Sequence, residues 1–170
     1  MTHKQFNDLV LQYQKPVISS IFKMVYSWEV SRDLAQESFL KLWKMRKKIQ
    51  KDKPTFTLLY RVAMNLSIDY LRRESNLSFL PLQEDYKFNN IQNRDPEFRE
   101  MLLNCCSKLN PRQRAVFNLR DLEGLTFEEI SEILEISVGN VRSNLHLARK
   151  NIKQNLFEVY QIDKEYFNEM

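Results

Sequence analysis

Hydrophobic residues recur at the three- and four-residue spacing of a helix along almost the whole chain. The first such segment runs from Gln5 to about Ser27, and Pro16 is predicted to kink or break it near Lys15. The sequence shows no strand-type alternation or hairpin dipeptide, and only two glycines and five prolines interrupt it. The pattern therefore predicts an all-α protein.

A second helix is predicted to begin at an N-cap, Ser31, and to end near Lys48. Its apolar arc is opposed by a polar arc, and Leu40 falls in the middle of the polar side. A single exposed leucine is common. The neighbours of this one are polar, so it could also be the centre of a small protein-binding patch. These neighbours are Asp33, Gln36 and Glu37.

A basic loop, 46–56, leads into a third predicted helix over about 57–74. One side of this helix is apolar, and the other carries Arg61, Asn65 and Arg72. Ion pairs or hydrogen bonds between side chains three or four positions apart on the helix would explain why these residues are polar. Alternatively, they are donors of a nucleic-acid face, and the loop contacts an unstacked base.

Residues 75–94 break the helical pattern with a proline and several asparagines, so we interpret them as an interdomain linker. Two further start signals follow, each a capping residue before a proline: Asp95-Pro96 and Asn110-Pro111. The helix that begins at the second signal is predicted to end at Gly124. The adjacent Cys105 and Cys106 form a poor disulfide pair and are interpreted as helix-packing residues.

The stretch 125–153 carries two helix starts in close succession. Thr126 and Glu129 have the spacing of a capping box, and Ser137 can cap a second helix. The turn between them is only Glu135-Ile136-Ser137. Two helices joined by so short a turn are typical of a helix-turn-helix, whose second helix enters the major groove of DNA.

The second helix of this pair has one apolar stripe and one polar face. The stripe consists of Val141, Leu145, Ala148 and Ile152. The other face carries cations and amides that can donate to phosphates and base edges. Gly139 is either tolerated in the first turn or lets the backbone approach DNA closely. An ordinary amphipathic helix pair with a solvated basic face is the alternative.

Charge and composition narrow the possible functions. The 170 residues carry a formal net charge of +4, and residues 1–75 alone carry +7, from 14 Lys and Arg against 7 Asp and Glu. A basic chain favours a nucleic-acid partner. Without a bilayer-length apolar run or a signal peptide, we expect the protein in the cytoplasm. His3 and His146 lie far apart in the sequence and form no metal cluster or nucleophile–base pair, so we expect no cofactor and no catalysis.

Four segments together resemble the extracytoplasmic-function (ECF) sigma factors, the two-domain minimal members of the main bacterial sigma family. The segments are DLAQESFLKLW (33–43), LYRVAMNLSIDYLRR (59–73), LNPRQRAVFNLRDLEGLTFEEISEIL (109–134) and SVGNVRSNLHLARKNI (137–152). Each is moderately specific, and the resemblance covers about residues 5–75 and 97–156. The sequence departs from the family pattern at five positions, which are Leu58, Glu135, Asn140, Asn144 and Leu147.

The resemblance implies roles for three sets of residues. Core RNA polymerase would be bound by Asp33, Gln36, Glu37, Leu40 and Lys44. The minus-ten promoter element would be opened and read by Lys51, Lys53, Phe56, Arg61, Asn65 and Arg72. The minus-thirty-five element would be bound by Ser137, Gly139, Asn140, Arg142, Ser143, His146, Arg149 and Lys150.

The same resemblance implies a domain organisation and further partners. An N-terminal domain, 1–75, would be joined by a linker, 76–95, to a helix-turn-helix domain, 96–156, with an acidic tail, 157–170. Promoter DNA, core RNA polymerase and an anti-sigma factor are the implied partners, with no small-molecule substrate. A homodimeric helix-turn-helix regulator and an all-helical enzyme acting on nucleic acid are the alternatives.

Overall fold

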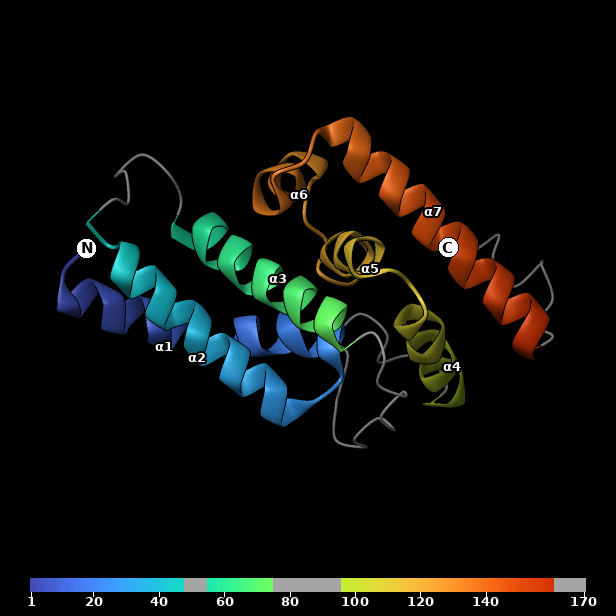
Figure 1. Ribbon diagram of the computed structural model, residues 1–170, viewed down its shortest axis with the longest axis horizontal. Coiled ribbons are helices and arrows are strands. Elements are labelled where there is room, and N and C mark those ends of the chain that lie inside the picture. Colours follow the sequence, from blue (N-terminus) through green and yellow to red (C-terminus); the bar gives the residue numbers. More distant parts are fainter. Residues whose placement is uncertain (48–54, 75–95, 161–170) are drawn as a thin grey trace.

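The protein consists of helices that form two packed groups (Figure 1). The structure, a computed structural model, describes residues 1–47, 55–74 and 96–160. Every regular element in these three ranges is a helix, which confirms the predicted fold class. The predicted linker, 76–95, and the last ten residues of the acidic tail lie outside the described residues.

The N-terminal domain is formed by α1 (His3–Val25), α2 (Trp28–Met45) and α3 (Thr55–Arg73). Each of these helices packs on the other two (Figure 1). Apolar side chains that recur every three or four positions fill the space between them, as the sequence pattern predicts. The largest fully buried ones are Val17, Ile21, Phe22, Met24, Leu42, Leu59 and Met64.

One sequence-based expectation for this domain is wrong, and another is narrowed. Helix α1 continues through Pro16 without a break, so of the two predicted effects of this proline only a kink stays a prediction. Helix α2 is capped by Ser27, whose Oγ accepts a hydrogen bond from the Val30 amide at 3.4 Å. Ser31 lies inside α2, fully buried, and donates its hydroxyl hydrogen to the Ser27 carbonyl.

The C-terminal domain contains α4 (Pro96–Ser107), α5 (Pro111–Phe117), η1 (Asn118–Leu122), α6 (Phe127–Leu134) and α7 (Val138–Tyr160). The predicted cap of α5 is confirmed, because the Asn110 side chain accepts a hydrogen bond from the Gln113 amide at 2.9 Å. Cys105 and Cys106 are buried free thiols, as expected for packing residues.

The helix that begins with α5 is not regular up to Gly124, in contrast to the sequence-based expectation. It widens at Asn118 into η1, a π-helix, a form that commonly marks functional sites in helices. Gly124 then ends it with a φ of +76°, a conformation that glycine adopts without steric cost.

The two domains pack against each other and share one apolar core. Arg114 of α5, which is only 6% exposed, lies at their interface. Its Nη1 donates to the Met24 carbonyl of α1 at 2.6 Å, and its Nη2 donates to the Ser107 carbonyl of α4. One guanidinium group therefore binds the negative, carbonyl ends of two helices, one from each domain.

Other polar contacts surround Arg114 at the same interface. The Asn118 side chain donates to the Lys23 carbonyl at 2.7 Å, which binds a second carbonyl at the end of α1. The Lys23 ammonium lies 3.4 Å from the Glu123 carboxylate, and both side chains are nearly buried. Burial raises the pKa of Glu123, although the Lys23 ammonium opposes the shift. The domain interface is thus apolar at its core and closed by helix-end and ion-pair contacts.

We expect Arg114→Met to lower the free energy of unfolding by about 2–3 kcal/mol, because it removes charged hydrogen bonds from buried carbonyl groups. The matched control is Arg112→Met, which removes an exposed arginine from the same helix. Urea unfolding followed by circular dichroism measures both. Equal losses in the two variants would contradict the assigned role of Arg114.

Candidate functional site

The predicted polymerase-binding residues form a single exposed stripe on α2. Asp33, Glu37, Leu40 and Lys44 are spaced four, three and four positions apart, and Gln36 lies beside them. All five are exposed, and Leu40 exposes 51% of its surface. Glu37 also pairs with Lys41 at 2.9 Å on the same helix. The structure therefore brings the whole predicted set together.

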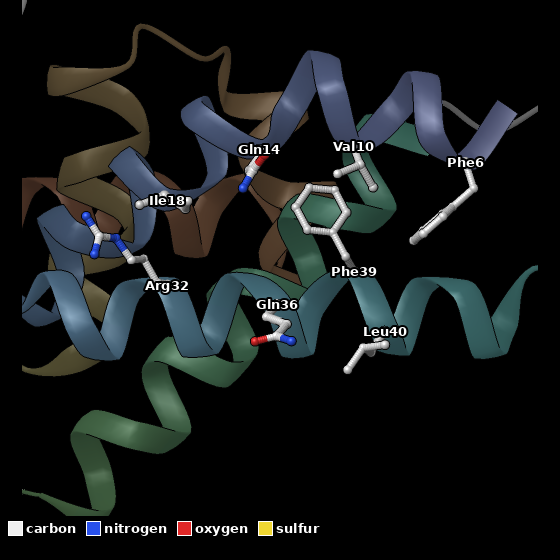
Figure 2. A pocket seen from close by; sticks show the side chains of 8 residues that line it. All are labelled: Phe6, Val10, Gln14, Ile18, Arg32, Gln36, Phe39 and Leu40. Atoms are coloured by element: carbon white, nitrogen blue, oxygen red, sulfur yellow. The ribbon is translucent and has the colours of Figure 1, made fainter. Parts of the chain in front are cut away.

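An apolar groove runs along this stripe, between α1 and α2 (Figure 2). Its volume is about 460 Å³. Helix α1 contributes a line of side chains four positions apart, and α2 contributes Gln36 and Leu40 from the stripe. The lining residues are Phe6, Val10, Gln14, Ile18, Arg32, Gln36, Phe39 and Leu40. The contribution of α1 was not predicted, because its apolar periodicity was assigned entirely to the core.

Three of the predicted minus-ten residues lie along α3, at spacings of four and seven positions, and one of them is engaged by another helix. Asn65 and Arg72 are exposed on α3, and Arg72 lies 3.8 Å from Asp69. Arg61 instead contacts the C-terminal end of α6. Its Nε and Nη2 donate to the Glu132 carbonyl at 3.2 and 2.8 Å, and its Nη1 donates to the Glu135 carboxylate at 2.9 Å. These contacts span about seventy residues of sequence, so local pairing rules could not find them.

Phe56 begins the same surface but is half-buried. Its ring packs 4.3 Å from the Tyr60 ring and 5.6 Å from the Tyr13 ring, measured between centroids. This aromatic cluster fixes the start of α3 against α1. Lys51 and Lys53 lie outside the described residues.

Helices α6 and α7 form the predicted helix-turn-helix. The capping box is confirmed: the Thr126 amide donates to Glu129 at 2.8 Å, and the Glu129 amide donates to Thr126 at 3.2 Å. These hydrogen bonds lower the pKa of the Glu129 carboxyl. Ser137 caps α7 by accepting from the Asn140 amide at 3.2 Å.

The recognition helix α7 presents its predicted polar face to solvent. The apolar stripe, Val141, Leu145, Ala148 and Ile152, is buried. All eight predicted minus-thirty-five residues are exposed. They are Ser137, Gly139, Asn140, Arg142, Ser143, His146, Arg149 and Lys150.

Two of these cations have partners that the sequence did not reveal. Arg149 forms a bidentate pair with Asp121 of η1, at 2.9 Å from Nε and 2.6 Å from Nη2. The hydrogen bonds that Arg149 donates to this carboxylate raise the pKa of Arg149. Arg142 lies over the Phe127 ring, 5.2 Å from its centroid. The face is therefore basic, and two of its arginines are oriented by other elements of the domain.

Within the described ranges, no group of three or more His, Cys, Asp or Glu residues could hold a metal ion. No helix in those ranges is long and apolar enough to cross a bilayer.

Comparison with known proteins agrees with this arrangement of surfaces. The family described as Sigma-70 region 2 matches residues 9–76, and the family described as Sigma-70, region 4 matches residues 99–152. The chain is 32% identical over 163 residues to the ECF RNA polymerase sigma-E factor of Salmonella typhimurium, covering 88% of this chain and 85% of that protein. It belongs to the ECF sigma factors.

Other relatives extend the same finding. The chain is 28% identical over 168 residues to the RNA polymerase sigma factor YlaC of Bacillus subtilis, covering 92% of this chain and 95% of that protein. Its fold is similar to that of the sigma factor RpoE in complex with the anti-sigma factor NepR from Bartonella quintana. That match has a TM-score of 0.70 at 16% identity and covers 92% of this chain and 99% of the other.

CnrH, solved in complex with the cytosolic domain of CnrY, is similar in the same way. Its TM-score is 0.68 at 18% identity, over 91% of this chain and 89% of the other. At these identities the two structures support the fold. With the sequence relatives, they place the protein among alternative sigma factors, which direct RNA polymerase to promoters. The homodimeric regulator is not favoured.

The two glycines of this sigma factor are expected to respond to alanine in opposite directions. A Cβ at Gly139 would meet only the Ser137 Oγ, at 3.9 Å, so Gly139→Ala should stabilise the protein by about 0.4–1 kcal/mol. Gly124→Ala must adopt a φ of +76° and should destabilise it by about 1–2 kcal/mol. Urea unfolding of both variants measures the sign of each change in the free energy of unfolding. A destabilised Gly139→Ala variant would show that α7 itself needs the glycine.

Proposed function

We propose that this sigma factor binds core RNA polymerase through the α2 stripe of Asp33, Gln36, Glu37, Leu40 and Lys44. The observation that carries the proposal is the position of Leu40. It is a half-exposed leucine inside a polar stripe, at the edge of the apolar groove between α1 and α2. An apolar groove beside polar anchors suits a helical partner, whose apolar face enters the groove while its polar flanks meet the stripe.

The two DNA-binding surfaces are proposed to lie on different domains. The minus-ten surface comprises Asn65, Arg72 and Arg61 of α3, with Phe56 and the basic loop through Lys51 and Lys53. A base unstacked from the duplex would be bound there, which lowers the cost of local melting. The minus-thirty-five surface is the exposed face of α7. Its cations bind phosphates, and its amides and hydroxyls contact base edges.

The protein is proposed to act as a dissociable specificity subunit without catalytic activity, cofactor or small-molecule substrate of its own. It would work in the cytoplasm, where the polymerase is. Two structural neighbours were solved in complex with an anti-sigma factor or the cytosolic domain of another protein. By analogy, we propose an anti-sigma factor as a partner of this chain.

We expect Leu40→Asp to weaken binding to core RNA polymerase by at least about tenfold, because it places a charge where an apolar contact is required. Leu11→Asp is the matched control: it introduces the same charge at another exposed leucine, on α1 and outside the groove lining. A pull-down with purified core polymerase measures both variants.

Run-off transcription on genomic fragments provides the functional readout of the same pair. The wild type and Leu11→Asp should direct promoter-specific transcripts, and Leu40→Asp should not. A wild-type protein that neither binds core polymerase nor yields a transcript would contradict the proposed function. Equal losses in both variants would contradict the position of the binding surface.

A further inference from the structure

We propose that Leu147 is a specificity-determining residue of the minus-thirty-five surface, where it contacts the methyl group of a thymine in the major groove of promoter DNA. This inference rests on the proposed function of α7 and adds an apolar base contact to it. Leu147 interrupts the polar face of this helix, and the amphipathic pattern of α7 gives it no role.

Leu147 is a large hydrophobic residue that the protein leaves in solvent. Its exposed fraction is 44%, and it is not part of the apolar core of the described residues. Two other large hydrophobic residues of α7 are exposed, Phe157 and Val159, and both lie at the C-terminal end of the helix. Leu147 instead lies within the stretch that carries the minus-thirty-five surface.

The helical spacing places Leu147 in line with three of the predicted DNA contacts. Asn140, Ser143, Leu147 and Lys150 are three, four and three positions apart, so their side chains follow one stripe along α7. Leu147 follows the buried Leu145 by two positions, a rotation of about 200° around the helix axis. The leucine therefore points away from the core, on the outer edge of the C-terminal domain (Figure 1).

Two polar neighbours of Leu147 are engaged elsewhere in the protein. The Asn144 Nδ2 donates to the Asn140 carbonyl at 2.8 Å, one turn toward the N-terminal end of α7. The Asn151 Nδ2 donates to the Gln113 Oε1 at 3.4 Å, toward α5. The leucine surface between these two amides is left to solvent.

The arginines of α7 lie on a different flank of the same exposed face. Arg142 lies over the Phe127 ring of α6. Arg149 pairs with Asp121 of η1. Positive charge is thus concentrated toward α6 and η1, and the stripe with Leu147 is the less charged part of the face. Phosphate contacts suit the first flank and base contacts the second.

Leucine has one kind of complement in the major groove. Base pairs present ring nitrogens, carbonyl oxygens and amino groups there, all of them polar, and the thymine methyl is the apolar group among them. Leu147 can neither donate nor accept a hydrogen bond, so it would strip water from a polar base edge without compensation. Against a methyl group, both surfaces leave water favourably. Leu147 therefore favours a thymine at one position of the element.

The experiment removes the methyl group from the DNA and the leucine from the protein. Run-off transcription on genomic fragments first identifies a promoter of the holoenzyme. Each thymidine of its minus-thirty-five element, on either strand, is then replaced by deoxyuridine, which lacks only the methyl group. Holoenzymes with the wild type, Leu147→Ala or Val159→Ala are titrated against fluorescein-labelled duplexes and followed by fluorescence anisotropy. Val159→Ala is the matched control, because it shortens an exposed apolar side chain of the same helix outside the surface.

We expect one deoxyuridine position to weaken binding of the wild type and of Val159→Ala by about three- to fivefold, the loss that one buried methyl group supports. Leu147→Ala should bind the unmodified promoter at least as weakly as the wild type binds this modified one. It should not respond to the same replacement, because the contact is already absent.

Three results would overturn the proposal. Wild-type binding that no deoxyuridine position weakens would leave Leu147 as one of the common exposed leucines without a ligand. An equal loss in the wild type and Leu147→Ala would assign the methyl contact to another residue. Weaker binding of Leu147→Ala to core polymerase without DNA would assign the leucine to a protein contact.

The transcripts separate this proposal from the proposed function. If only the role of Leu147 is wrong, the wild-type holoenzyme yields promoter-specific transcripts, and its response to deoxyuridine does not depend on the leucine. If the sigma function itself fails, no transcript appears with any variant, and both proposals fall.

Discussion

The packing of the two domains of this sigma factor depends on one buried guanidinium group at the ends of two helices. Arg114 binds carbonyl groups in the last turns of α1 and α4. Carbonyl groups at these positions have no backbone N–H partner within their own helix. Burial lowers the pKa of this arginine. A buried charge is tolerated only where polar groups replace water around it, and two helix ends supply such groups without an acidic side chain.

This choice of partners adds hydrogen bonds to helix ends at an interface whose core is apolar. Asn118 makes the same kind of contact with Lys23. Its side chain is placed by the π-helical turn, so the irregular backbone of η1 serves the domain interface. The interface thus combines an apolar core with hydrogen bonds to helix ends.

The sequence predicted those features whose signals are local. The capping box of Thr126 and Glu129 and the cap at Asn110 each involve residues three positions apart, and each is confirmed. Ser27 and Ser31 are both residue types that cap helices, and the structure uses Ser27. Ser31 is buried inside α2. Burial depends on the packing of the other helices, so no rule based on local sequence could predict it. The π-helix at Asn118 and the ion pair of Arg149 with Asp121 also depend on partners from distant segments.

The exposed stripe on α2 was predictable for a related reason. A leucine in a polar arc contradicts the amphipathic pattern of its own helix. The sequence pattern alone left two explanations open, a common exposed leucine and a protein-binding patch. The groove beside it was not predictable. The groove depends on how α1 and α2 pack. Apolar residues such as Phe6 and Val10 would recur at the same helical spacing whether they filled a core or lined a surface groove.

Arg61 and Arg149 show why a basic face in the sequence need not be a free basic face in the protein. Each is a predicted nucleic-acid donor, and each forms an ion pair with a carboxylate, from Glu135 and Asp121 respectively. A chain with all its cations unpaired would bind any polyanion. In the proposed DNA complexes, phosphate would replace carboxylate at these two arginines, so each exchange would add little electrostatic attraction. Binding would then depend more on base contacts. Such pairing lowers non-specific affinity while keeping every donor, which suits a subunit that must select one promoter among many competing sites.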